Sequence, residues 1–200
     1  MGFTWGGLQT VLVIDTESYV DMQSGQRRLL ALSFEIISVD NEEVQQSGSY
    51  IIAPRGGYHP DARSARVHGL TAKEVAGSGT DVELVLTKLA TLMLSVDALV
   101  AHDITADVAV LVTEAVMVSH HSALEALIRI SHVCTKIEST SLCSIPLCNI
   151  SGWKWPSLVE AGKTLLGEDW RRDMATHHSC PEDVRMCSRV FLRICQIHTQ

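Results

Sequence analysis

The tripeptide Asp15-Thr16-Glu17 places two carboxylates two positions apart near the N-terminus. It starts at the end of the run VLVID, residues 11–15, which is rich in β-branched residues and typical of a central strand buried on both faces and ending in a carboxylate. Residues i and i+2 of an extended strand point to the same side, so Asp15 and Glu17 could bind neighbouring cations. Because an Asp-x-Glu pair is common, this prediction depends on the residues that accompany it.

Three later segments carry residues of the same chemical types. The segment His68-Gly69-Leu70-Thr71 precedes a predicted helix, and Ala101-His102-Asp103 leads to Asp107. His178 stands five positions before Asp183. Together with the first pair, these segments supply carboxylates and histidines, the residue types that metal-assisted hydrolysis uses as ligands and base.

The order and spacing of these segments resemble the DnaQ-like 3'-5' exonucleases, the histidine (DEDDh) branch of the DEDD superfamily. The family's first motif is an Asp-x-Glu on the opening strand, matched by Asp15 and Glu17. Its second motif is an Ala-His-Asn followed four residues later by an Asp. Residues 101–103 and Asp107 match it, with Asp in the place of Asn.

The resemblance continues to the end of the chain. His178 and Asp183 match the family's third motif, a His followed five residues later by an Asp at the start of the last helix. The segments HGLT, at 68–71, and KWPSL, at 154–158, are similar to its connecting motifs. The resemblance therefore covers nearly the whole sequence.

The resemblance implies an α/β chain with a ribonuclease H-like fold, in which a mixed five-stranded sheet has helices on both faces and residues 1–200 form a single exonuclease domain. It implies a metal-dependent 3'-5' exonuclease that uses two divalent cations, Mg²⁺ or Mn²⁺, and releases nucleoside 5'-monophosphates from DNA or RNA. Hard oxygen ligands suit these cations, and two of them can stabilise an in-line phosphoryl displacement. The implied ligands are Asp15, Glu17, Asp107 and Asp183.

His178 is the implied general base, since an imidazole with a pKa near 6.5 can accept the proton of water near neutral pH. Within one regular helix, His178 and Asp183 would be rotated by about 140° from each other. The pattern Ser179-Cys180-Pro181-Glu182 predicts a helix start with a capping box, which would leave His178 outside the helix. The neighbouring His177 is the alternative base.

Substrate contacts are implied for five further positions, namely Thr16, His68, Leu70, His102 and Asp103. Local hydrogen bonding of the histidine at 68 and packing of the leucine at 70 are the structural alternatives. Where the family has Asn, the carboxylate at 103 could add a metal ligand or repel a phosphate. The family's bulky aromatic before the second-motif Asp is replaced by Ala106, which removes stacking or packing area.

Two tryptophans, Trp153 and Trp155, flank Lys154 in the KWPSL region. This pattern could stack a base and hold a phosphate, but anchoring of Trp155 in the core is the interpretation we favour. Cys180 stands where the family commonly has a small Ala, and we expect it to pack as a small buried apolar side chain.

The elements that must position these residues follow from hydrophobic periodicity and end signals. Besides the first strand, the patterns predict strands at 29–39, 48–53, 98–101 and 131–136. They predict helices at 82–96, at 106–118, from Pro156 to about 166, and from Ser179 to about 197. Thr80 is the expected cap of the first of these helices. The stretch 137–154 is predicted to be the longest loop.

Composition limits the class of protein. An apolar content of 46% without a long polar tract indicates one globular domain. The net charge of −7 argues against a broad basic face that coats nucleic acid, but not against an enzyme that grips a strand end. Six cysteines without a C-x-x-C pair indicate reduced thiols, and no apolar run has the length of a membrane span. We therefore expect a soluble, intracellular, cytoplasmic protein.

The predicted partners are single-stranded or frayed 3' ends of DNA or RNA, and no membrane. A homodimer and a polymerase partner are both compatible with the resemblance. The competing function is a non-catalytic nucleic-acid or polymerase-binding module that keeps the exonuclease fold. The presence of all four carboxylates favours the enzyme, because a degenerate copy is expected to lose at least one ligand.

Overall fold

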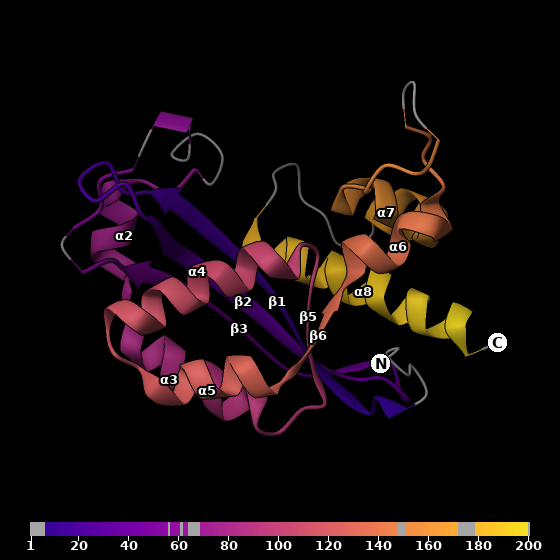
Figure 1. Cartoon of the computed structure of the whole chain (residues 1–200), viewed down its shortest axis with the longest axis horizontal. Helices are drawn as coiled ribbons and strands as arrows, with labels where there is room; N and C mark the ends of the chain where they lie inside the picture. The colour runs from indigo at the N-terminus through magenta and orange to yellow at the C-terminus, as the bar shows by residue number, and fades with distance from the viewer. Residues whose placement is uncertain are drawn as a thin grey trace.

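The computed structural model describes residues 7–55, 57–60, 62–63, 69–147, 151–171 and 179–199. In this part of the chain, one mixed sheet runs in the order β4-β3-β2-β1-β5-β6 (Figure 1). Its strands are β1 (Thr10–Val20), β2 (Arg27–Ser38), β3 (Glu43–Ala53), β4 (Thr80–Asp81), β5 (Ala98–Ala101) and β6 (Ser131–Cys134). The first three strands are antiparallel, and β5 and β6 run parallel to β1. The predicted α/β class is confirmed, with the two-residue β4 as a strand that the sequence did not predict.

Helices cover both faces of the sheet, as predicted. They are α2 (Ala72–Ser78), α3 (Val82–Met93), α4 (Ile104–Met117), α5 (His121–Arg129), α6 (Thr135–Cys143), α7 (Leu158–Leu166) and α8 (Cys180–His198), with a 3₁₀ turn, η2 (Gly167–Arg171). In Figure 1, α3, α4 and α5 lie on the near side of the long strands, whereas α8 crosses behind them.

The alternation of β1 explains this arrangement. Leu12 and Ile14 belong to the core cluster that contains the apolar residues of α3, α4 and α5. Val11 and Val13 belong to the cluster formed with α8. The predicted burial of this strand on both faces is therefore confirmed. Its predicted end at Asp15 is wrong, because β2 pairs with β1 as far as Val20, with a register shift after Glu17.

Three helix starts depend on local caps. The predicted cap Thr80 is wrong, since it lies in β4 and the side chain of Asp81 accepts from the amide of Glu83 to begin α3. Helix α2, which was not predicted, begins with a capping box of Thr71 and Glu74. A second box, formed by Ser157 and Glu160, begins α7.

The predicted loop over 137–154 is shorter than expected, because α6 occupies its first part. The sequence of this helix, TKIESTSLC, is rich in Thr and Ser and lacks a clear apolar period, which is why the helix was missed. Helix α5 was also missed, and His120 is its cap, with a side chain that accepts from the amide of Ala123. Five described cysteines are free. Within the described ranges, no helix has the length and apolar character needed to cross a membrane.

Candidate active site

The first and second predicted motifs meet where β1 extends beyond β5. The parallel pairing of these strands covers only Val11–Val13 of β1, so the following edge of β1 faces the first turn of α4. There the backbone amide and the hydroxyl of Thr16 both donate to Oδ1 of Asp107, at 3.1 and 2.7 Å. Asp107 is 7% exposed. Beyond the residues paired with β5, the edge of β1 therefore binds the Asp107 carboxylate.

The turn before α4 has an unusual backbone. Asp103 is the N-cap residue, its φ is 144°, and its side chain makes no capping hydrogen bond. Non-glycine residues in such sparsely populated regions cost about 1–3 kcal/mol and are found mostly where surrounding contacts enforce them. Here the carbonyl of Asp103 accepts from the amides of Ala106 and Asp107, and its side chain turns away to form an ion pair with Lys136 at 2.7 Å.

The start of α8 reaches the same place from the other face of the sheet. Cys180 is buried, as expected, and its Sγ donates to the carbonyl oxygen of Asp15 at 3.0 Å. Ser179 is the N-cap, and its carbonyl accepts from the amides of Glu182 and Asp183 at 2.9 Å. The predicted capping box is wrong in one respect, because the Ser179 side chain makes no capping bond. Asp183 thus lies in the first turn of a helix anchored to Asp15.

The electrostatics link the four predicted metal ligands. Burial, together with the charges of Asp107, Asp183 and Glu17, raises the pKa of Asp15 to about 8. Burial also raises the pKa of Asp107 to about 6, against the opposing effect of its hydrogen bonds from Thr16. Asp15 is therefore within electrostatic reach of the other three predicted ligands, and its surroundings disfavour an uncompensated negative charge.

The donor set has the chemistry of a divalent-cation site, since carboxylate oxygens are the ligands that Mg²⁺ and Mn²⁺ prefer. Its side chains do not form a closed ligand shell, however. In the described parts of the chain, no three His, Cys, Asp or Glu side chains gather closely enough to hold a metal ion. The four predicted ligands are therefore of the type that divalent cations prefer, but their side chains are not gathered as a metal site in this structure.

His102, a predicted substrate contact, is engaged at both ring nitrogens. Nε2 lies 3.1 Å from the carbonyl oxygen of Pro156, and Nδ1 lies 2.9 Å from the hydroxyl of Thr135. Because a carbonyl can only accept, Nε2 donates and Nδ1 of the neutral ring accepts. Burial lowers the pKa of His102, which favours this neutral form. Its ring therefore fastens the segment before α7 to the start of α4.

Of the remaining predicted site residues, Leu70 lies in the described part of the chain and three histidines do not. Leu70 packs against the cluster of Tyr19, Leu30 and Val75, in agreement with its structural alternative. His68, His177 and His178 lie outside the described residues, so their predicted roles as substrate contact and general base stay predictions.

Two residues beside the second motif were missed or misread in the sequence. Lys136 had no motif to mark it, although its partner Asp103 departs from the family pattern and could have prompted a search for a cation. The expectation that Trp155 anchors the core is wrong, because this side chain is 64% exposed. The backbone next to it is held by the hydrogen bond that the Pro156 carbonyl accepts from His102.

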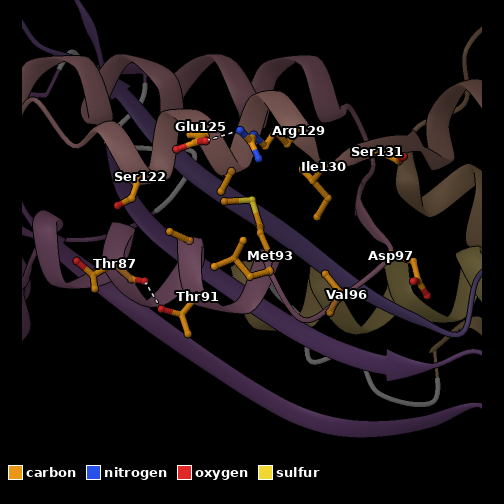
Figure 2. Close-up of a pocket in the computed structure, with 13 residues that line it drawn as sticks. Thr87, Thr91, Met93, Val96, Asp97, Ser122, Glu125, Arg129, Ile130 and Ser131 are labelled. Atoms are coloured by element: carbon orange, nitrogen blue, oxygen red, sulfur yellow. Dashed lines mark hydrogen bonds and ion pairs between the residues drawn. The ribbon is translucent and has the colours of Figure 1, made fainter.

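A cavity of about 510 Å³ lies elsewhere, between α3 and α5 (Figure 2). Met93 and Ile130 line it, and the ion pair of Glu125 with Arg129 lies at its side. None of the predicted site residues contributes to its lining. The chemistry predicted from the sequence therefore lies outside this cavity, on the shared edge of β1, α4 and α8.

Comparison with known proteins gives matches of fold alone. No family model matches the chain, and no curated protein matches it in sequence. Among solved structures, the nuclease domain of 3'hExo, a DEDDh family member bound to rAMP, has a TM-score of 0.64 at 12% identity. That match covers 96% of this chain and 94% of the other.

Two further structures match over most of this chain. A 3'-exonuclease from a study of 3'-end specific recognition of a histone mRNA stem-loop has a TM-score of 0.65 at 12% identity, over 95% of this chain and 83% of its own. E. coli Exonuclease I in complex with a dA16 oligonucleotide has a TM-score of 0.69 at 13% identity, but the match covers 42% of that longer chain. The predicted likeness to DEDDh exonucleases is thus confirmed in the fold, which is the ribonuclease H-like fold of their nuclease domains.

Proposed function

We propose that this chain is a 3'-5' exonuclease that hydrolyses phosphodiester bonds from the 3' end of DNA or RNA and releases nucleoside 5'-monophosphates. The observation that carries the proposal is the meeting of two acids from distant parts of the sequence, the half-buried Asp15 and the buried Asp107, both with raised pKa values. The fold adds support, because its structural neighbours include 3'-5' exonucleases.

The proposed ligands of two Mg²⁺ or Mn²⁺ ions are Asp15, Glu17, Asp107 and Asp183. When bound, such cations polarise the scissile phosphate and lower the pKa of a water molecule. The chain's own part is to hold the carboxylates ready. Thr16 fixes one oxygen of Asp107, and the Cys180 thiol fastens α8 to the backbone of Asp15.

The general base in this proposal is His178, which directly precedes the N-cap residue of α8. Its imidazole would accept a proton from the attacking water, while the 3'-oxygen of the preceding nucleotide leaves. Support comes from the position of Ser179 at the start of a helix anchored to Asp15. His177 stays the alternative.

The proposed substrate is a single-stranded or frayed 3' end. Exonuclease I has been solved in complex with single-strand oligonucleotides such as dA16, which supports this substrate class by analogy of fold. The choice between DNA and RNA depends on contacts to the 2'-hydroxyl group.

The test is cleavage of 5'-labelled single-stranded DNA and RNA of matched sequence, with Mg²⁺ or Mn²⁺ and with EDTA. We expect products that shorten from the 3' end only when Mg²⁺ or Mn²⁺ is present. The substitution Asp15→Asn should abolish this cleavage. Glu125→Gln, an exposed acid on α5, is the matched control and should cleave normally. His178→Ala should lose about 10²- to 10⁴-fold in rate. Metal-independent cleavage, or an unchanged rate in Asp15→Asn, would contradict the proposal.

A further inference from the structure

An exposed tryptophan stands beside the second motif. The ammonium of Lys136, on α6, lies 5.1 Å from the ring centroid of Trp155, within the range of a cation–π contact. The same ammonium forms the 2.7 Å ion pair with Asp103. An aromatic ring, a cation and the N-cap residue of α4 are thereby joined one helical turn before Asp107.

The backbone around the exposed ring is held on both sides. Before it, the amide of Lys154 donates to the carbonyl of Ile145 at 2.8 Å, and its ammonium pairs with Glu160 at 2.6 Å. After it, the carbonyl of Pro156 accepts from His102 at 3.1 Å. The structure thus fixes the backbone of Trp155 while leaving most of its side chain in solvent, which lowers the entropy cost of binding a flat partner.

The position of the ring matches the scale of a bound strand. Asp103 and Asp107 are four residues apart, about 6 Å along the axis of α4. Successive nucleotides of a stacked strand are about 3.4 Å apart. Because Lys136 joins the ring to Asp103, Trp155 lies within a few nucleotide spacings of Asp107.

We propose that Trp155 stacks a nucleobase of the bound single strand, close to its 3' end. The pairing with Lys136 cancels the negative charge that Asp103 would otherwise present to the phosphates. Every base has a face that can stack on an indole, so this contact tolerates any sequence. It requires an unpaired base, because both faces of a base within a duplex are already covered. The proposal rests on the exonuclease function and adds to it a determinant for single-stranded ends.

The test measures binding without cleavage. A fluorescently labelled short oligodeoxyadenylate is titrated with protein in EDTA, and its anisotropy gives the dissociation constant. Trp155→Ala should weaken binding by about 5- to 150-fold, the range for loss of one stacked base, whereas Trp155→Phe should retain most of it. Trp153→Ala is the matched control, since this neighbouring tryptophan is also exposed, and it should bind as the wild type does.

A second measurement separates stacking from a structural role. Single abasic sites are placed at successive positions from the 3' end, and each oligonucleotide is titrated with wild type and Trp155→Ala. At the position that meets the ring, the abasic site should remove the difference between the two proteins. An equal difference at every position would assign Trp155 a structural role and overturn stacking. Stacking would also be overturned if Trp155→Ala bound with wild-type affinity, or if the wild type did not bind at all.

Cleavage in Mg²⁺ is scored separately, so that the two proposals can fail independently. A chain that binds through Trp155 but never cuts would refute the exonuclease and keep the stacking contact. A chain that cuts from the 3' end with equal affinity in wild type and Trp155→Ala would refute the contact alone.

Discussion

Two buried acids on the same side of α4 have opposite surroundings. Asp107 and Glu114 are seven residues apart, which is close to two full turns, so both point at the sheet. Glu114 is fully buried and paired with Arg28 at 2.7 Å, and it accepts from the amide of Leu29 at 2.9 Å. Asp107 receives only neutral donors, from Thr16, among the hydrogen bonds and ion pairs of the described residues.

The difference separates an acid whose charge is paired inside the fold from one whose charge is not. Glu114 has its cation inside the protein, so it fastens α4 to β2. Asp107 has an acidic neighbour, Asp103, and a raised pKa, and in the proposed function a bound cation compensates its charge. Both carboxylates are buried, so burial does not distinguish them. The charge of the hydrogen-bond partner distinguishes them.

The largest effect we expect is on catalysis, from Asp107→Asn. The amide keeps the acceptor for Thr16 but loses the charge, so the cleavage rate should fall about 10³-fold or more, since cation polarisation is worth several kcal/mol. The melting temperature should stay the same or rise, because a buried charge without a cation has been removed. A mutant with normal cleavage would assign Asp107 to the fold instead.

Next in size is the loss of folding stability in Glu114→Ala. It leaves the Arg28 guanidinium buried without its partner, which typically costs about 3–5 kcal/mol in the free energy of unfolding. Urea denaturation measures this. The double variant Arg28→Met with Glu114→Leu should recover most of the loss, because neither charge is then buried. If Glu114→Ala is as stable as the wild type, the contrast between the two acids fails.

The pH dependence of the free energy of unfolding should come largely from Asp15. Its pKa is about 8 in the folded state and about 3.9 in an unfolded chain. Between these values the folded state holds a proton that the unfolded state has released, so without metal the free energy of unfolding should fall as the pH rises from 4 to 8. Thermal melts in EDTA test this fall. Asp15→Asn should flatten the curve, and a mutant with the same slope would contradict the assignment.

The smallest predicted effect belongs to Thr16, which orients Asp107. Thr16→Val removes the hydroxyl that donates at 2.7 Å but keeps the backbone amide. Loss of such a supporting hydrogen bond typically costs about 10- to 100-fold in metal affinity or activity. The Mg²⁺ concentration that gives half-maximal cleavage measures it. Thr16→Ser keeps the hydroxyl and is the control, and equal values for the two variants would contradict this role.

The fold followed from the sequence wherever hydrophobic period and end signals agreed. The strand 98–101 and the last helix from Ser179 were predicted close to their observed bounds. Helix α6 was missed because its Thr and Ser residues carry no apolar period. The continuation of β1 past Asp15 was missed because it depends on pairing with β2, which local sequence does not encode.

For the candidate site, the motifs predicted three acids that the fold brings within electrostatic reach of Asp15, but not the residues that hold them in place. The bond from Thr16 to Asp107 requires that β5 end before β1 does, which is a property of the sheet. The pairing of Asp103 with Lys136 joins positions 33 residues apart. Such partners cannot be inferred from a motif, since no spacing rule connects α4 to α6.

The thiol of Cys180 offers a way to observe motion at this site. It is 4% exposed and bonded to the backbone of Asp15, and burial raises its pKa well above the ordinary value. A thiol reagent can therefore reach it only when the first turn of α8 lifts from β1. The labelling rate of this one cysteine, followed by peptide mass, reports how often the third motif separates from the first. A cation that draws Asp183 and Asp15 together should slow that labelling.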